Sequence, residues 1–176
     1  MLQTEAGIGI IDQHALHERL LYDKLKAQVD AGPLDSQRLL VPLPIDLSAP
    51  EAACVRENEK FLASLGFTVE PFGGDTVLLS GYPAILGRMD PTEAFEALLE
   101  PLLTLGKKLT RSELIEKSLH SMACKAAVKA GDRLREESMA MFSDIARHGR
   151  QFHCPHGRPA IIEFTCAELD KMFRRG

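Results

Sequence analysis

The sequence of 176 residues lacks several features that would assign it to a common class of protein. It has no apolar run near the ~20 residues that a membrane-spanning helix needs, and its start does not resemble a signal peptide. Repeats and low-complexity segments are also absent. With 45% apolar and 26% charged residues, the composition is that of an ordinary globular protein. We therefore expect a cytoplasmic protein that does not enter a membrane.

Cysteine and positive charge are scarce. The four cysteines, at positions 54, 124, 154 and 166, include no C-x-x-C pair, and four are few for a disulfide scaffold of this length. We expect reduced thiols, with Cys54 and Cys166 in the core because they have no ligand-type neighbours. The net charge is -4, whereas domains that bind nucleic acid unaided are usually basic. If the protein acts on duplex DNA, we expect weak binding and a second molecule that brings it there.

Apolar periodicity and capping residues predict an α+β fold. The predicted strands are 8–11, 39–47, 67–71, 76–80 and 161–164, with too few residues before the first to complete a sheet edge. The predicted helices are 12–29, 49–65, 91–105, 110–130, 134–147 and one that residues 165–168 cap. Pro42 and Pro44 suit an edge strand. We expect one sheet-based lobe of residues 1–32 and 114–176, and an inserted, mostly helical lobe of residues 33–113.

His14 and Glu18 are the first candidate metal ligands. They are four residues apart, so they project from one helix face about a turn apart, and Leu21 and Leu25 continue that face as a buried stripe. Burying a histidine and a carboxylate without a partner is costly, and a metal ion is one such partner. Asp12, at the strand–helix junction, reaches the same space. The alternative is an ordinary capping and core role.

Residues 153–159 (HCPHGRP) are the second candidate. Two prolines and a glycine predict a stiff turn on which Cys154 and His156 direct a thiolate and an imidazole at one ion. That ligand set suits zinc and tolerates other first-row metals, although a turn with a buried thiol is the alternative. Cys124 is a further candidate ligand, for which the alternatives are plain packing and replacement by His120 on the same helix face.

Four elements together resemble the C-terminal domain of the MutL mismatch-repair proteins. Residues 12–15 (DQHA), with Glu18 and Asp23, resemble the motif DQHA(x)2E(x)4E, although aspartate replaces its last glutamate. Residues 123–125 (ACK) resemble an Ala-Cys-Arg/Lys element, residues 154–159 match CPHGRP in full, and residues 173–175 (FRR) fit a terminal FxR motif. These elements occur in the family's order over nearly the whole chain, although the first strand of the family domain is missing or shortened.

The resemblance implies a metal-dependent endonuclease that nicks one strand of duplex DNA, and a homodimer. An N-terminal ATPase domain, absent here, would bind ATP, and the full-length protein would meet a MutS-type mismatch recognition protein. Around the metals the resemblance places Asp12, His14, Glu18, Cys124, Cys154 and His156, the first three being catalytic, with Asp23, Arg158 and Arg175 in support. We expect Asp23 to support the site rather than to bind a metal directly, because five positions on an ideal helix turn it from Glu18 by roughly 140°.

Two metals suit this set of residues. Cysteine-rich sites hold zinc tightly, whereas phosphodiester cleavage often favours a harder ion. We therefore expect a structural or regulatory Zn2+ beside a catalytic Mn2+. The chief alternative function is a non-catalytic module in which the same residues hold only a structural zinc while the domain dimerises and recruits partners. A zinc hydrolase of small substrates lacks support, because no H-E-x-x-H motif is present.

Residues 37–42 (QRLLVP) resemble the short motif by which bacterial MutL binds the replicative sliding clamp. A glutamine followed by adjacent aliphatic residues can dock an extended segment into an apolar pocket. We expect this contact to be made by Gln37, Leu39, Leu40, Val41 and Pro42. The alternative is a plain strand that ends in proline. A clamp that already encircles DNA would bring an acidic nuclease to its substrate.

Overall fold

The computed structural model describes residues 2–3, 6–106, 108–127, 153–154 and 157–174. The chain divides into two compact units, the first made of residues 1–21 and 127–176 and the second of residues 22–126. The second unit therefore includes the C-terminal part of α1 (Gln13–Ala31) and the whole of α5 (Arg111–Ala126). The lobes predicted from the sequence have other boundaries, at residues 32–33 and 113–114, because nothing local shows which unit a helix packs in.

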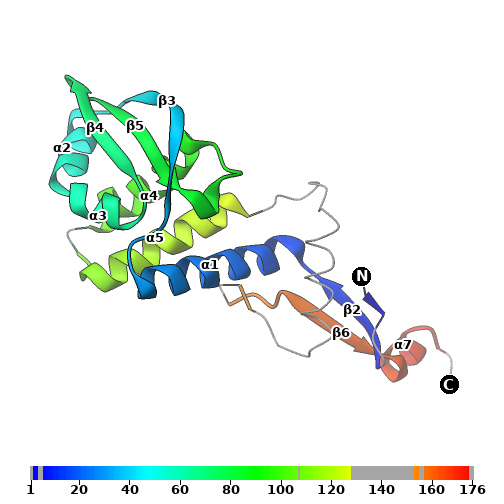
Figure 1. The fold of residues 1–176 in the computed structure, drawn as a ribbon. Helices are drawn as coiled ribbons and strands as arrows, with labels where there is room; N and C mark the ends of the chain where they lie inside the picture. Colours follow the sequence, from blue (N-terminus) through cyan, green and yellow to red (C-terminus); the bar gives the residue numbers. More distant parts are fainter. Residues whose placement is uncertain (1, 4–5, 107, 128–152, 155–156, 175–176) are drawn as a thin grey trace. The chain divides into compact units, whose positions relative to one another are not determined.

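The first unit is built on a three-stranded antiparallel sheet in the order β1-β2-β6. The central strand β2 (Gly7–Ile11) pairs with both β1 (Leu2–Gln3) and β6 (Ile161–Thr165) (Figure 1). Gly7 permits this close approach, because a Cβ there would lie 1.9 Å from the carbonyl oxygen of Phe164. The strands predicted at 8–11 and 161–164 are confirmed, whereas β1 completes a sheet edge that the sequence was expected not to supply.

A capping box begins α7 (Cys166–Met172), as the sequence predicts. The N–H of Thr165 donates to Oε2 of Glu168 at 2.8 Å, and Oγ1 of Thr165 accepts from the N–H of Glu168 at 3.2 Å. All of α7 is described, and it buries none of its side chains. The prediction that Cys166 lies in the core was wrong, because this cysteine begins a helix that stays exposed.

The second unit has its own three-stranded antiparallel sheet, in the order β3-β5-β4. β3 (Ser36–Asp46) and β4 (Thr68–Gly73) are its edge strands, and β5 (Thr76–Pro83) runs between them (Figure 1). The predicted hairpin and the predicted edge strand with its two prolines are confirmed. The register of β3 against β5 shifts between Arg38 and Leu43, so four residues of β3 lie outside the regular ladder.

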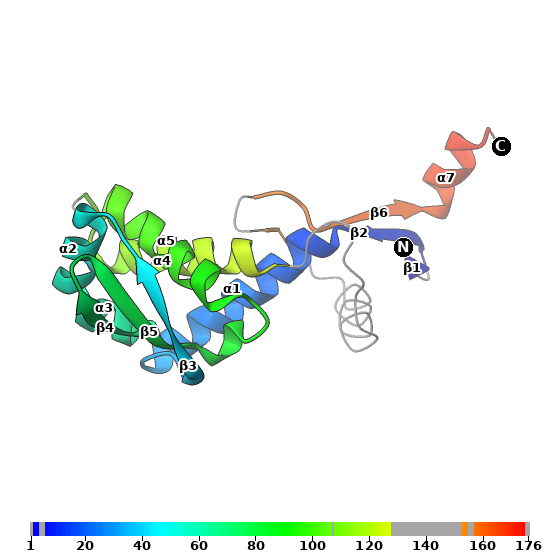
Figure 2. The ribbon, with the colours of Figure 1, turned by 90° about the horizontal axis from the view of Figure 1, so that it is seen from above.

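Helices pack against this sheet and form most of the core of the second unit. α3 (Glu59–Ser64) contacts β4, and α4 (Pro91–Leu105) contacts both β5 and α5 (Figure 2). The side chain of Phe95 on α4 is fully buried, and its ring centroid lies 6.0 Å from that of Phe67. This aromatic contact joins α4 to the chain segment that enters β4.

The helix predicted at residues 49–65 is interrupted. α2 (Ala49–Glu57) ends before Asn58, whose side-chain Nδ2 donates to the carbonyl oxygen of Cys54 at 2.8 Å. Such side-chain bonds compete with helical backbone bonds, and α3 begins anew at the next residue. The capping box at the start of α2 is confirmed. α5 ends at residue 126 rather than near 130, and the helix predicted at 134–147 lies outside the described residues.

Candidate metal centre

The N-terminal end of α1 carries Asp12, His14 and Glu18. The N–H of Asp12 donates to the carbonyl oxygen of Ala160 at 2.9 Å, which ties the helix start to the residue before β6. Oδ1 of Asp12 accepts from the N–H of Ala15 at 3.1 Å, the bond of a helix cap. A ring nitrogen of His14 and a carboxylate oxygen of Glu18 lie within 4.8 Å of each other, and Glu18 is only 2% exposed. The predicted pair on one face is therefore present.

The turn that contains Cys154 lies against this helix start. The N–H of Cys154 donates to the carbonyl oxygen of Arg158, and the N–H of Gly157 donates to that of Cys154, both at 2.8 Å. Cys154 is buried in a cluster with Ala15, Leu16 and Ala160. The structure thus brings a thiol from residue 154 beside a helix that begins at residue 13. The sequence separates them by about 140 positions.

The remaining predicted site residues are distributed as follows. Cys124 is half-buried on α5, in the second unit. Asp23 is half-buried on α1 in the same unit, and Arg158 is exposed in the turn of the first unit. His156 and Arg175 lie outside the described residues. His120, the rival candidate to Cys124, packs its ring edge-on to Tyr22, with centroids 6.3 Å apart.

Three residues that orient α1 were not predicted. In the second unit, the hydroxyl of Tyr22 donates to Glu116 on α5, and Nζ of Lys26 lies 2.5 Å from the other oxygen of this carboxylate. These bonds, that to Lys26 first, lower the pKa of Glu116. Together they align α1 with α5. The sequence offers no signal for this contact, because the partners are about 90 residues apart.

The chemistry of the donor set fits a transition metal. The described residues offer a carboxylate oxygen and an imidazole nitrogen one helical turn apart, with a thiol next to the same helix turn. Histidine nitrogen and cysteine sulfur suit zinc, and carboxylate oxygen also suits manganese. The start of α1 and the 153–159 turn therefore make a candidate metal centre within the first unit.

A second candidate site lies on edge strand β3, at residues 37–42. The side chains of Leu40 and Val41 are 103% and 73% exposed. Both belong to the stretch between Arg38 and Leu43 where the register with β5 shifts. Gln37 is half-buried, and its amide lies beside Gly87. Adjacent exposed aliphatic side chains are unusual on a strand with one covered face, so this segment presents an apolar surface.

Comparison with known proteins identifies the family. Residues 1–134 match the family model of the MutL C terminal dimerisation domain. The chain is 40% identical over 174 residues to the DNA mismatch repair protein MutL of Clostridium beijerinckii, covering 98% of this chain and 26% of that protein. It is 40% identical over 176 residues to that of Geotalea uraniireducens, covering 99% and 29% respectively. The chain belongs to the family of MutL C-terminal dimerisation domains.

The matched ranges show how much of each relative this chain represents, and whether they include the candidate metal centre. The chain spans about a quarter of the length of the curated relatives it matches. The 153–159 turn follows the range of the family model, but the similarity to the relatives covers nearly the whole chain.

Among the described residues, no helix combines the length and apolar character that a bilayer crossing demands.

Proposed function

We propose that this chain is the nicking and dimerisation domain of a bacterial MutL protein, a metal-dependent endonuclease that cuts one strand of duplex DNA in mismatch repair. The observation that carries the proposal is the position of the buried Glu18, one turn from His14 and on the helix whose start packs against Cys154. Family membership supports the role in repair. A cytoplasmic location follows from the same proposal.

The proposed ligands are Asp12, His14, Glu18, Cys124, Cys154 and His156. When bound, the metals would polarise a phosphate oxygen and lower the pKa of an attacking water. The protein's own contribution is positional. The cap bond to Ala15 holds the Asp12 carboxylate at the end of the helix, and burial restricts Glu18 to the inner face. Zinc suits the cysteine and histidine ligands, and manganese suits the carboxylates. Asp23, Arg158 and Arg175 would support the site.

Cys124 joins the proposed ligands through the resemblance of residues 123–125 to the family's Ala-Cys-Arg/Lys element. Within the second unit, the ring of His120 packs edge-on to that of Tyr22, with centroids 6.3 Å apart. We therefore propose Cys124, rather than His120, as the ligand from α5.

The sheet of the first unit supports a homodimer. Ile10 on β2 and Ile162 on β6 are register partners, so their side chains share a face. They are 43% and 49% exposed. A second copy of the chain would cover this apolar face, in agreement with a family of dimerisation domains.

Residues 37–42 would bind a sliding clamp that already encircles DNA. This contact would bring the chain to DNA, which its net charge of -4 does not favour by itself. The exposed Leu40 and Val41 on edge strand β3 are available to a sliding clamp. Binding a clamp that encircles DNA makes the nuclease–DNA contact intramolecular, with an effective concentration that can reach ~mM. Mismatch recognition by a MutS-type protein, and ATP binding, belong to the rest of the full-length protein.

The Asp12→Asn variant tests the nuclease. Asparagine caps helices as well as aspartate, so the fold should remain while the negative charge is lost. We expect unchanged thermal unfolding and retained zinc, but no manganese-dependent nicking of a supercoiled plasmid in the presence of the loaded clamp. In parallel, Cys154→Ser combined with His156→Ala should sharply lower the zinc content. Nicking by Asp12→Asn at the parent's rate would refute the catalytic role, and unchanged zinc in the double variant would refute the ligand set.

A non-catalytic zinc module is the second candidate, because Oδ1 of Asp12 already has a structural task as the cap of α1. In that case the parent protein would bind zinc and dimerise but would not nick DNA with manganese and clamp. The comparison of parent and Asp12→Asn therefore separates the two functions.

A further inference from the structure

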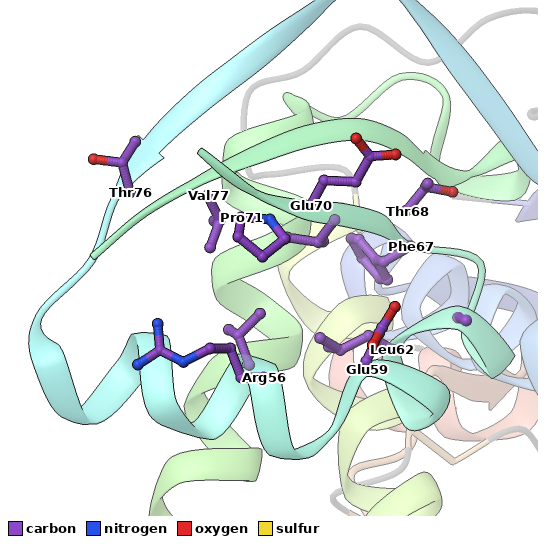
Figure 3. Close-up of a pocket in the computed structure, with 12 residues that line it drawn as sticks. Arg56, Glu59, Leu62, Phe67, Thr68, Glu70, Pro71, Thr76 and Val77 are labelled. Atoms are coloured by element: carbon purple, nitrogen blue, oxygen red, sulfur yellow. The ribbon is translucent and has the colours of Figure 1, made fainter. Parts of the chain in front are cut away.

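A cavity of about 200 Å³ lies in the second unit, between α2, α3 and the β4–β5 hairpin (Figure 3). Its inner lining is apolar and includes Leu62, Phe67 and Val77. Its rim is charged, with Arg56 on α2, Glu59 on α3 and Glu70 on β4. Nothing in the proposed nicking or clamp-binding sites uses these residues.

The size of the cavity limits what it can hold. Pockets that enclose whole small ligands measure roughly 300–1,000 Å³. This one is smaller and open, so it matches a single bulky apolar side chain more closely than a complete cofactor. Such a side chain must be attached to a chain that runs along the rim.

The rim offers a place for that chain. β4 is an edge strand of the order β3-β5-β4, so within the described second unit no strand pairs with its outer side. Edge strands add an extended peptide through backbone hydrogen bonds, while neighbouring pockets select its side chains. Pro71 in the middle of β4 lacks an N–H, which restricts the added strand to a short one.

The charged residues at the rim would orient a bound segment in one direction. Figure 3 shows Arg56 and Glu59 at opposite ends of the cavity, with Pro71 and Phe67 above the space between them. The helix break at Asn58 lies between these two charged residues in the chain. Both side chains are exposed, and in the described part of the chain neither forms an ion pair. Opposite charges at the two ends favour a partner with an acidic and a basic residue on either side of an apolar one.

We propose that β4 and this cavity bind an extended segment of a partner protein with the pattern acidic-x-apolar-x-basic. Alternate residues of a strand share a face. The apolar side chain would enter the cavity, the acidic residue would face Arg56, and the basic residue would face Glu59. A lipid surface or a nucleic acid presents charge of one sign and matches this rim less well. The proposal goes beyond the nuclease function and does not depend on it.

Peptide binding to the 176-residue chain tests the proposal. The probe is a fluorescein-labelled peptide with the core Asp-Thr-Leu-Thr-Lys, and fluorescence polarisation reports binding. Two matched peptides replace Leu with Ala or exchange Asp and Lys. Full burial of a leucine side chain corresponds to a factor of about 10 or more in affinity. We expect the Ala peptide to lose about that factor and the charge-exchanged peptide to bind more weakly than the probe.

Variants of the protein locate the binding. Ala63 is exposed and lines the cavity, so Ala63→Trp should fill the cavity and abolish binding. Arg56→Glu combined with Glu59→Arg changes only exposed side chains, and it should reverse the preference between the two charge orders. Circular dichroism melts confirm that each variant is folded. The proposal is overturned if the parent binds no probe at about 1 mM, if it binds both charge orders equally, or if a folded Ala63→Trp binds as the parent does.

Discussion

The turn that positions Cys154 depends on the backbone conformation of Gly157. Its φ is +79°, in the left-handed region, and a Cβ there would meet no atom of the described residues within 4 Å. The cost of Gly157→Ala is therefore that of the backbone conformation alone, about 1–2 kcal/mol. Gly157→Asn should cost less, because asparagine tolerates this region. For a chain of this length, about 1 kcal/mol corresponds to roughly 2–4 °C in Tm.

Two assays follow from this estimate. Thermal unfolding without added metal should place the variants in the order glycine, asparagine, alanine, with alanine lowest by roughly 2–8 °C. Zinc competition against a chromophoric chelator should give the same order of affinity, because the turn positions the thiol through the bond from Gly157 N–H to the Cys154 carbonyl. If alanine matches glycine in both assays, the turn does not depend on the left-handed residue and the reasoning is wrong.

Three further predictions address recruitment, assembly and pH. Changing Gln37 and Leu40 to Ala should leave fold, zinc and dimer unaltered but remove stimulation of nicking by a loaded clamp; stimulation equal to the parent's would mean that the segment is merely a strand. Ile162→Lys should raise the dimer dissociation constant by about tenfold or more, as measured by analytical ultracentrifugation, and an unchanged constant would exclude this sheet face from the interface. Hydrogen bonds from the side chain, and then the backbone, of Thr110 lower the pKa of Glu113 below its usual 4.5. Because the pKa of Glu113 is lower in the folded state, its ionised carboxylate stabilises the fold above about pH 4.5. This stabilisation is lost as the pH falls through the lowered pKa. The difference in unfolding free energy between parent and Glu113→Gln should therefore shrink on acidification, and a difference that stays constant as the pH falls would contradict this assignment.

The sequence alone predicted most local structure. Helix caps are read from neighbouring residues, so the starts of α2, α4 and α7 agree with prediction. The pairing of His14 with Glu18 follows from helical spacing and is also present. The break at Asn58 was missed because its side chain competes with a backbone bond that apolar periodicity does not report.

Tertiary structure decided what local pattern cannot encode. The contact between the 153–159 turn and the start of α1 depends on sheet pairing that brings Ala160 to Asp12. The alignment of α1 with α5 depends on bonds from Tyr22 and Lys26 to a carboxylate far along the chain. The exposure of Leu40 and Cys166 also appears only when the chain is folded. Residue spacing determines which side chains share a face of one element, but only packing determines which elements meet and which faces remain in solvent.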